Sequence, residues 1–277
     1  MLILQSKKVK RILIGFVWLF VLLLMLTPLL FIFISAFKSG PSHYLHVLRD
    51  TFTLAAVKLT LAATILSVVF NTIFGLSAAW LVTFYDFKGK VLLNTLIDLP
   101  FSVSPVIAGL IFVLTFGRTG WAYPLLAHFD IQIIFAKPAI FLATIFVTFP
   151  FVARELIPFL AVRGREEEQT AAFLGGNLVT IFREITYPAI KRPLMYGVVL
   201  ATARAMGEFG AVAVVSGNIR GETQTLPLLV EALYNEFKIS DAFAVATILV
   251  FFSCVIMILK GRIDQKKRKA DEQCISN

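Results

Sequence analysis

The chain has 277 residues, of which 58% are hydrophobic and 16% charged, and its mean hydropathy is +0.84. Soluble globular proteins carry roughly 25% charged residues, and the long uncharged runs here suit a bilayer, which takes about 20 apolar residues per helix. The composition therefore excludes a soluble protein and indicates a polytopic helical membrane protein. The net charge of +9 would suggest nucleic-acid binding in a soluble protein, but not in a chain of this composition.

The first apolar run, 12–37, follows a basic N-terminus. It is too long for a cleaved signal peptide, whose apolar region spans only about 7–15 residues. We expect a retained helix, so that 1–54 comprises a tail, the first membrane helix and an outer loop.

The next two helices are expected at 55–83 and 91–116, and both contain polar groups. Asn71 lies inside the first, and the cluster DLPFSVSPVIAG at 98–109 brings Asp98, Ser102 and Ser104 together with two prolines. Such a cluster favours a broken helix that faces an aqueous cavity, although a merely kinked packing helix would give the same pattern. These polar side chains, and Ser216 further along the chain, could line a translocation path. The alternative is that each forms a hydrogen bond between two helices.

After a fourth helix at 138–160, a charged stretch, REEEQTAAFLGGNLVTIFREITYP, occupies 165–188. Glutamates 166–168 would begin a helix, where negative charge complements the helix dipole. Gly175 and Gly176 would end it, and Asn177 would cap a second short helix that ends at Pro188. The pattern predicts two helices joined by a glycine elbow, a rigid knob; the alternative is an amphipathic hairpin on the inner membrane surface.

This stretch resembles the cytoplasmic EAA loop of binding-protein-dependent ABC importer permeases. Glu168 takes the acidic position and Gln169 the variable one, Gly175 takes the glycine, and Tyr187 precedes Pro188 where the family has Leu-Pro. Thr170 and Ala171 take the two alanine positions. The resemblance implies that about 164–193 couples the chain to a cytoplasmic ATPase through Glu168, Gln169, Thr170, Ala171, Gly175, Gly176 and Pro188.

The sequence contains no G-x-x-x-x-G-K-[ST] phosphate loop, the element that cradles nucleotide phosphates in many ATPases. We therefore expect no cofactor on this chain, and the energy for transport must come from a partner or an ion gradient. ATP and Mg would be held by the partner ATPase.

The fifth helix is expected at 194–216, with Arg204 and Glu208 four residues apart on one face, about halfway across. A lone charge at mid-membrane costs roughly 2.5–3.5 kcal/mol on insertion scales, which mutual pairing offsets. Arg204 and Glu208 could form a structural ion pair between helices, or they could gate or line an anion path; the sequence is compatible with both roles.

The outer loop 217–241 carries Arg220 and Glu222 among glycines. Exposed backbone N–H groups beside an arginine could bind an oxyanion or the acidic face of a docking partner. The alternative is an ordinary tight loop whose charge is solvated. Three scattered His and two Cys (254 and 274) lack the spacing of a metal site or a disulfide framework.

The last helix is expected at 242–260, which leaves 261–277 as a basic tail. Most of the 26 Lys and Arg then fall on one side of the membrane. By the positive-inside rule, both termini are cytoplasmic and six helices cross. The tail would anchor this topology beside anionic lipid.

Residues 55–260 also resemble the sulfate/thiosulfate group of importer permeases, its W-type subunit in particular, through ARAMGEFGAVAVVSGNIRGETQTLPLLVE at 203–231 and similar segments at 71–82 and 96–117. The resemblance implies a type I importer permease fold that is all-α. It also implies a sister permease, two ATPase subunits and a periplasmic anion-binding protein. A molybdate or tungstate permease is the nearest alternative, and an ion-coupled carrier that titrates Arg204 and Glu208 is one from another class.

Overall fold

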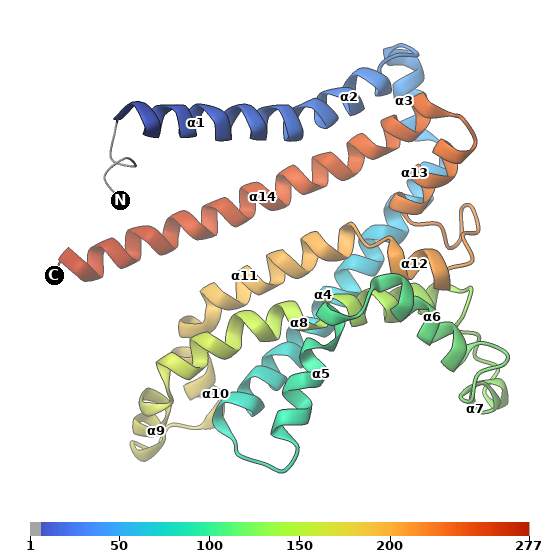
Figure 1. Ribbon diagram of the computed structural model, residues 1–277. Coiled ribbons are helices and arrows are strands. Elements are labelled where there is room, and N and C mark those ends of the chain that lie inside the picture. Colours follow the sequence, from blue (N-terminus) through green and yellow to red (C-terminus); the bar gives the residue numbers. More distant parts are fainter. Residues whose placement is uncertain (1–6, 277) are drawn as a thin grey trace.

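The computed structural model describes residues 7–276, and every regular element among them is a helix (Figure 1). Four helices are long and apolar enough to cross a membrane: Val9–Ala36, Thr51–Phe84, Lys137–Arg163 and Ile239–Ile263. A fifth span would result if a bent pair, Lys90–Ser102 with Pro105–Phe116, counts as one. The chain is thus an all-helical membrane protein with four to five candidate spans.

The core is a set of three long helices, α4 (Thr51–Phe84), α8 (Lys137–Arg163) and α11 (Tyr187–Met206). Small residues let them approach closely: a Cβ at Gly75 would lie 3.0 Å from the Val152 Cβ, and one at Gly197 would lie 3.0 Å from the Val152 Cα. The three helices therefore form one rigid unit against which the shorter elements pack.

The N-terminal helix lies outside this unit, with the last helix of the chain between them (Figure 1). It runs through α1 (Lys7–Val21), a π-helical segment η2 (Leu22–Leu26) and α2 (Thr27–Ala36). Its α2 part packs on α14 (Ile239–Ser276), where the rings of Phe31 and Phe243 meet edge to face at 5.5 Å. The helix expected at 242–260 thus begins earlier, and it continues through the segment that we expected to form a separate tail.

Two expected membrane helices are broken. The third consists of α5 (Lys90–Ser102) and α6 (Pro105–Phe116), bent by 113°, so the break predicted at the proline cluster is confirmed. The fifth was predicted as one helix over 194–216, which is wrong: α11 ends at Met206 and α12 spans Gly210–Val215. Gly207, with its low helix propensity, caps the end of α11.

The end predicted at Pro188 is also wrong. From α10 (Leu178–Ile181), the chain passes through a π-helical segment η3 (Phe182–Thr186) straight into α11, with Pro188 in its first turn. A proline lacks an N–H, and it fits in the first turn of a helix or where local π geometry relaxes the hydrogen-bond ladder. The proline therefore marks a change of helical pitch rather than an end.

The connections that we expected on the outer side hold short helices that the sequence did not predict. They are α3 (Pro41–Arg49), α7 (Tyr123–His128) and α13 (Leu226–Asn235). Two of them bind the helices beneath: His43 of α3 pairs with Asp241 at the start of α14 at 2.6 Å, and α13 packs on α14 and α4. These connections are therefore more ordered than loops of this composition suggest.

Candidate functional site

The elbow, residues 163–188, has the predicted turn between its two helices, although its second helix does not end at Pro188. Helix α9 (Glu166–Phe173) ends where Gly175 adopts a φ of +87°. The Gly175 amide donates to the Ala172 carbonyl at 3.0 Å, and the Gly176 amide donates to the Ala171 carbonyl at 2.9 Å, which is a Schellman motif. The Asn177 side chain then caps α10. The predicted glycine turn and cap are thus confirmed.

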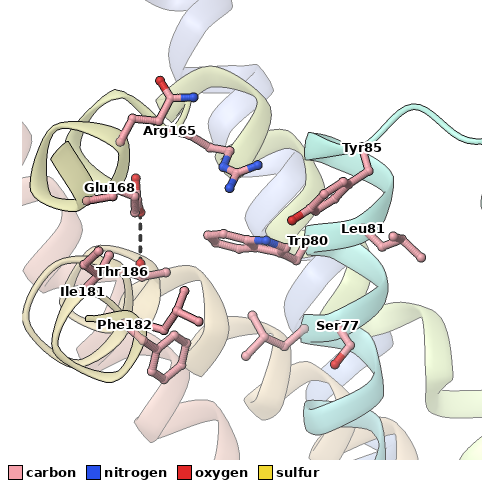
Figure 2. Close-up of a pocket in the computed structure, with 13 residues that line it drawn as sticks. Ser77, Trp80, Leu81, Tyr85, Arg165, Glu168, Ile181, Phe182 and Thr186 are labelled. Carbon is pink, nitrogen blue, oxygen red and sulfur yellow. Dashed lines mark hydrogen bonds between the residues drawn. The ribbon is translucent and has the colours of Figure 1, made fainter. Parts of the chain in front are cut away.

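Glu168 braces the elbow from within. Its buried carboxylate accepts a hydrogen bond from Arg163 Nη1 at 2.5 Å and another from Thr186 Oγ1 at 3.1 Å, the latter drawn in Figure 2. Arg163 also binds Glu167 at 2.6 Å. One carboxylate therefore joins the end of α8, the first turn of α9 and the π-helical entry to α11.

The charge state of Glu168 follows from these contacts. Burial raises the pKa of its carboxyl, but the hydrogen bonds from Arg163, the backbone and Thr186, together with the positive charge of Arg163, outweigh burial and lower the pKa below its ordinary value. Glu168 is therefore ionised at neutral pH, and the ion pair with Arg163 is intact there.

The outer surface of the elbow is apolar and uncovered. Phe173, Leu174, Leu178 and Val179 are 92%, 84%, 87% and 75% exposed; we call these four residues the elbow tip. Gln169 and Thr170 are exposed beside them, and Thr170 donates to the Glu166 carbonyl at 2.8 Å. A contiguous exposed apolar surface on a firm base is typical of a protein docking site.

A second region of interest lies where the two broken helices meet. A Cβ at Gly109 would lie 2.8 Å from the Ala211 carbonyl oxygen, and one at Gly210 would lie 3.0 Å from the Pro105 Cβ. Helices α6 and α12 therefore touch backbone to backbone, and the two breaks lie at the same level of the molecule.

Arg204 and Glu208 pair across the second break. Arg204 Nη1 lies 2.5 Å from Glu208 Oε2, and the Glu208 side chain is only 1% exposed. The predicted pair is thus present, but the two residues do not lie on one face of a single helix, because Glu208 follows the end of α11. Its second oxygen instead accepts from the Ala211 amide at 2.9 Å, so the pair joins the end of α11 to the start of α12.

Asp98 has a partner that the sequence did not reveal. It pairs with Arg154 of α8, whose guanidinium also lies 3.4 Å from the Asn94 side-chain oxygen. Arg154 lies inside the fourth helix, which we expected at 138–160 and which extends as α8 to Arg163. A cation inside a membrane helix usually pairs with an opposite charge. The position of Arg154 was therefore a sequence signal for an acidic partner such as Asp98.

The remaining polar residues of the predicted path fall into two sets. Asn71 is wholly buried and donates to the Ile145 carbonyl at 3.1 Å and to Thr148 at 2.8 Å, and Ser216 is wholly buried too. Ser102 and Ser104 are exposed at the α5–α6 break. Asn71 therefore joins α4 to α8 in this conformation, while the two serines lie beside the junction of the breaks.

The outer loop places Arg220 against α13. It pairs with Glu236, and its guanidinium lies 5.8 Å from the Phe52 ring centroid. Glu236 also binds Lys238 at 2.9 Å, and Glu222 is exposed. Arg220 is therefore held and largely neutralised, whereas Glu222 is open to a partner.

Comparison with known proteins agrees with these features. Residues 71–269 match the family described as binding-protein-dependent transport system inner membrane component. The sulfate transport system permease protein CysW of Synechococcus elongatus is 48% identical, covering 92% of this chain and 89% of that protein. The protein of the same name from Escherichia coli K12 is 41% identical, covering 95% and 92%. The CysT protein of Salmonella typhimurium, also a sulfate transport system permease, is 35% identical and covers 86% of each.

A solved structure shares the fold. A crystal structure of a bacterial alginate ABC transporter, in complex with an alginate pentasaccharide-bound periplasmic protein, contains a chain that superposes with a TM-score of 0.75. The two are 17% identical, and the match covers 95% of this chain and 98% of that one. The resemblance first seen in the elbow is thereby confirmed: the chain belongs to the family of binding-protein-dependent transport system inner membrane components, and it is a permease subunit of an ABC transporter rather than an enzyme.

Proposed function

We propose that this chain is one membrane subunit of an ATP-driven importer for sulfate. Relatives that are 41–48% identical over nearly their whole length carry the name sulfate permease, which favours sulfate or thiosulfate over molybdate and tungstate. A CysT relative supports a sister permease as its partner. Two ATPase subunits, which hold ATP and Mg, and a periplasmic binding protein complete the assembly.

In this proposal the chain crosses the membrane six times, with both termini in the cytoplasm. The sixth crossing is the broken pair α11–α12, added to the four long helices and the bent pair α5–α6. The elbow then lies on the cytoplasmic side, while α3, α7 and α13 lie outside. Arg220 and Glu222 would face the binding protein.

The observation that carries the proposal is the elbow tip, an apolar knob on an ion-paired base. Its residues would enter a groove on the ATPase, and Glu168 would keep α9 fixed to α8 and to the entry of α11, so that the ATPase moves all three together. The motion would reach the junction of the breaks, where Asp98, Ser102, Ser104, Arg204 and Glu208, with Asn71 and Ser216 behind them, would line or gate the path.

The test is sulfate uptake into proteoliposomes that contain the complex, with and without internal ATP. Gly175→Val places a β-branched residue at a φ of +87°, which such residues avoid. We expect uptake to fall by at least about tenfold, the factor for 1.4 kcal/mol, with membrane insertion intact. Gly15→Val is the matched control, because nothing lies within 4 Å of its added Cβ.

Other outcomes would redirect the proposal. Full uptake by Gly175→Val would remove the elbow from energy coupling. ATP-independent uptake would indicate an ion-coupled carrier instead, and loss of uptake with trace molybdate would change the substrate while retaining the mechanism.

A further inference from the structure

A cavity of about 690 Å³ separates the elbow from the last turns of α4 (Figure 2). Leu76, Ser77, Trp80 and Leu81 line one side, and Arg165 and Glu168 contribute its charges. Figure 2 shows the Arg165 side chain reaching from the corner between α8 and α9 toward Trp80 and Tyr85. The cavity thus combines an apolar wall with two opposite charges.

Both charged groups have an atom without a partner. The Nε of Arg165 and the Oε2 of Glu168 are buried and make no hydrogen bond, although Glu168 Oε1 is fully engaged. Among residues 9–263, whose side chains the structure describes, Arg165 has no carboxylate partner, and aromatic rings hold it instead, with centroids 5.7 Å (Trp80), 5.2 Å (Phe84) and 5.5 Å (Tyr85) away. A buried donor and a buried acceptor left open in one cavity predict a ligand that supplies an acceptor and a donor.

The cavity lies at the end of a membrane helix. The span Thr51–Phe84 ends there, and Trp80 and Tyr85 are residue types typical of the membrane–water interface. From the cavity, exposed apolar side chains continue along one face of α4 through Leu81, Ile73 and Phe70. At about 1.5 Å per residue, this stripe is about 16 Å long, close to the roughly 15 Å of one leaflet's hydrocarbon.

We propose that this cavity binds the headgroup of a zwitterionic phospholipid that carries a primary ammonium. Its phosphate accepts hydrogen bonds from the Arg165 guanidinium, its ammonium donates to Glu168 Oε2, and one acyl chain lies along the α4 stripe. Such a headgroup satisfies both open atoms, and it adds no net charge beside Arg163, Arg165, Glu167 and Glu168, whose charges already cancel.

The consequence is control of the elbow by the membrane. Because Glu168 braces α9 against α8 and η3, a lipid that engages its free oxygen also ties these segments to α4. The proposal goes beyond sulfate transport and does not depend on the substrate.

The experiment is native mass spectrometry of the detergent-solubilised complex, titrated with phosphatidylethanolamine, phosphatidylcholine or phosphatidylglycerol. We expect phosphatidylethanolamine to bind about tenfold more tightly than phosphatidylcholine, whose quaternary ammonium donates no hydrogen bond, and more tightly than phosphatidylglycerol, which has no cation. Arg165→Gln should weaken phosphatidylethanolamine binding about tenfold, and Glu168→Gln should abolish its advantage over phosphatidylcholine.

Arg183→Gln is the matched control, since Arg183 lies on the exposed side of the elbow, and it should bind lipid like the wild type. Equal affinity of the wild type for the three lipids would overturn the proposal, as would equal binding by Arg165→Gln and Arg183→Gln. A photo-crosslinker at Ser77 should capture lipid; capture of the sister permease instead would show that a protein segment fills the cavity. Intact assembly of each variant, checked by the mass of the complex, separates loss of the site from misfolding.

Discussion

Two corners of the molecule are built in the same way in different surroundings. Each has an arginine in the last turn of a long helix, a glycine at its end, and a buried glutamate that pairs with the arginine at the start of a short helix: Arg163, Gly164 and Glu168 at the elbow, and Arg204, Gly207 and Glu208 between α11 and α12. In each corner, the arginine complements the negative end of its helix dipole.

The difference between the corners lies in what else can satisfy their charges. At the elbow, Arg163 has a second carboxylate, Glu167, which is mostly exposed, and Thr186 shares Glu168. At the break, Glu208 is the only carboxylate within salt-bridge distance of Arg204 among the described residues. The same arrangement therefore has a spare carboxylate at the elbow and none at the break, where the Arg204–Glu208 pair acts as a lock, because an ion pair without a substitute costs more to break. Exposure of the arginines does not explain the difference, since Arg163 is 13% and Arg204 32% exposed.

The largest expected effect is at the break. Glu208→Gln leaves Arg204, whose side chain is 32% exposed, without a carboxylate partner among the described residues, so we expect the free energy of unfolding to fall by about 3 kcal/mol, the lower end for a buried pair. Thermal unfolding of the purified complex in mild detergent measures the loss. The double variant Arg204→Met with Glu208→Gln should recover part of the stability, because no charge remains unpaired.

A matched control for this variant is Glu231→Gln on the exposed side of α13, which should unfold like the wild type. If Glu208→Gln unfolds like this control, then water reaches the break and the contrast between the two corners fails.

A smaller effect is expected at the elbow. Glu168→Gln loses the charge that binds Arg163 and weakens the bond from Thr186, but Arg163 retains Glu167. We expect the free energy of unfolding to fall by about 1–2 kcal/mol in the same thermal unfolding measurement. A loss as large as that of Glu208→Gln would mean that Glu167 does not replace Glu168 as the partner of Arg163.

Acid should open the elbow partially and reversibly. Because the pKa of Glu168 is lowered in the folded chain, its ion pair stabilises the elbow above the ordinary glutamate pKa of about 4.3. This contribution is lost as the pH falls through the lowered pKa. Trp80 fluorescence, with Trp18 and Trp121 changed to Phe, should stay constant down to about pH 5 and change only below about pH 4.

The control for acid opening is Glu168→Gln, which should remove that transition. A transition near neutral pH in the wild type would contradict the assignment to Glu168.

The smallest effect is expected for a pair in water. Asp86 binds Lys90 at 2.8 Å in the loop before α5, and its side chain is almost fully exposed. The pKa of Asp86 is lowered by its hydrogen bond and attraction to Lys90, yet exposed pairs contribute little to stability. Asp86→Asn should therefore leave the unfolding midpoint unchanged. A clearly lower midpoint would show that an ion pair stabilises the fold through proximity alone, without burial.

The sequence predicted what depends on local chemistry. The Schellman turn at Gly175, the cap at Asn177 and the break in the proline cluster all follow from residues close together in the chain. The break in the backbone at Gly207 could not be predicted, since the apolar pattern of 194–216 is equally compatible with one continuous helix. The Asp98–Arg154 pair joins residues 56 apart in the sequence, so only packing of α5 on α8 reveals it.

The site was predicted to a similar extent. The elbow residues lie together as expected, because they are nearly consecutive. The elbow tip could not be predicted: Leu178 is exposed as part of it, whereas Ile181, three residues further on, is buried against the chain itself. Which apolar residues a short helix turns inward depends on neighbours such as α4, and these lie far away in the sequence.

The unbroken helical path from Leu178 through Met206 has a mechanical consequence. At about 1.5 Å per residue, it is a lever roughly 40 Å long, with the elbow at one end and the Arg204–Glu208 lock at the other. A tilt of only about 5° would move one end by about 3–4 Å relative to the other. Such a displacement is enough to separate two hydrogen-bonded groups, so a small push on the elbow can be converted into the opening of a single bond deep in the apolar region.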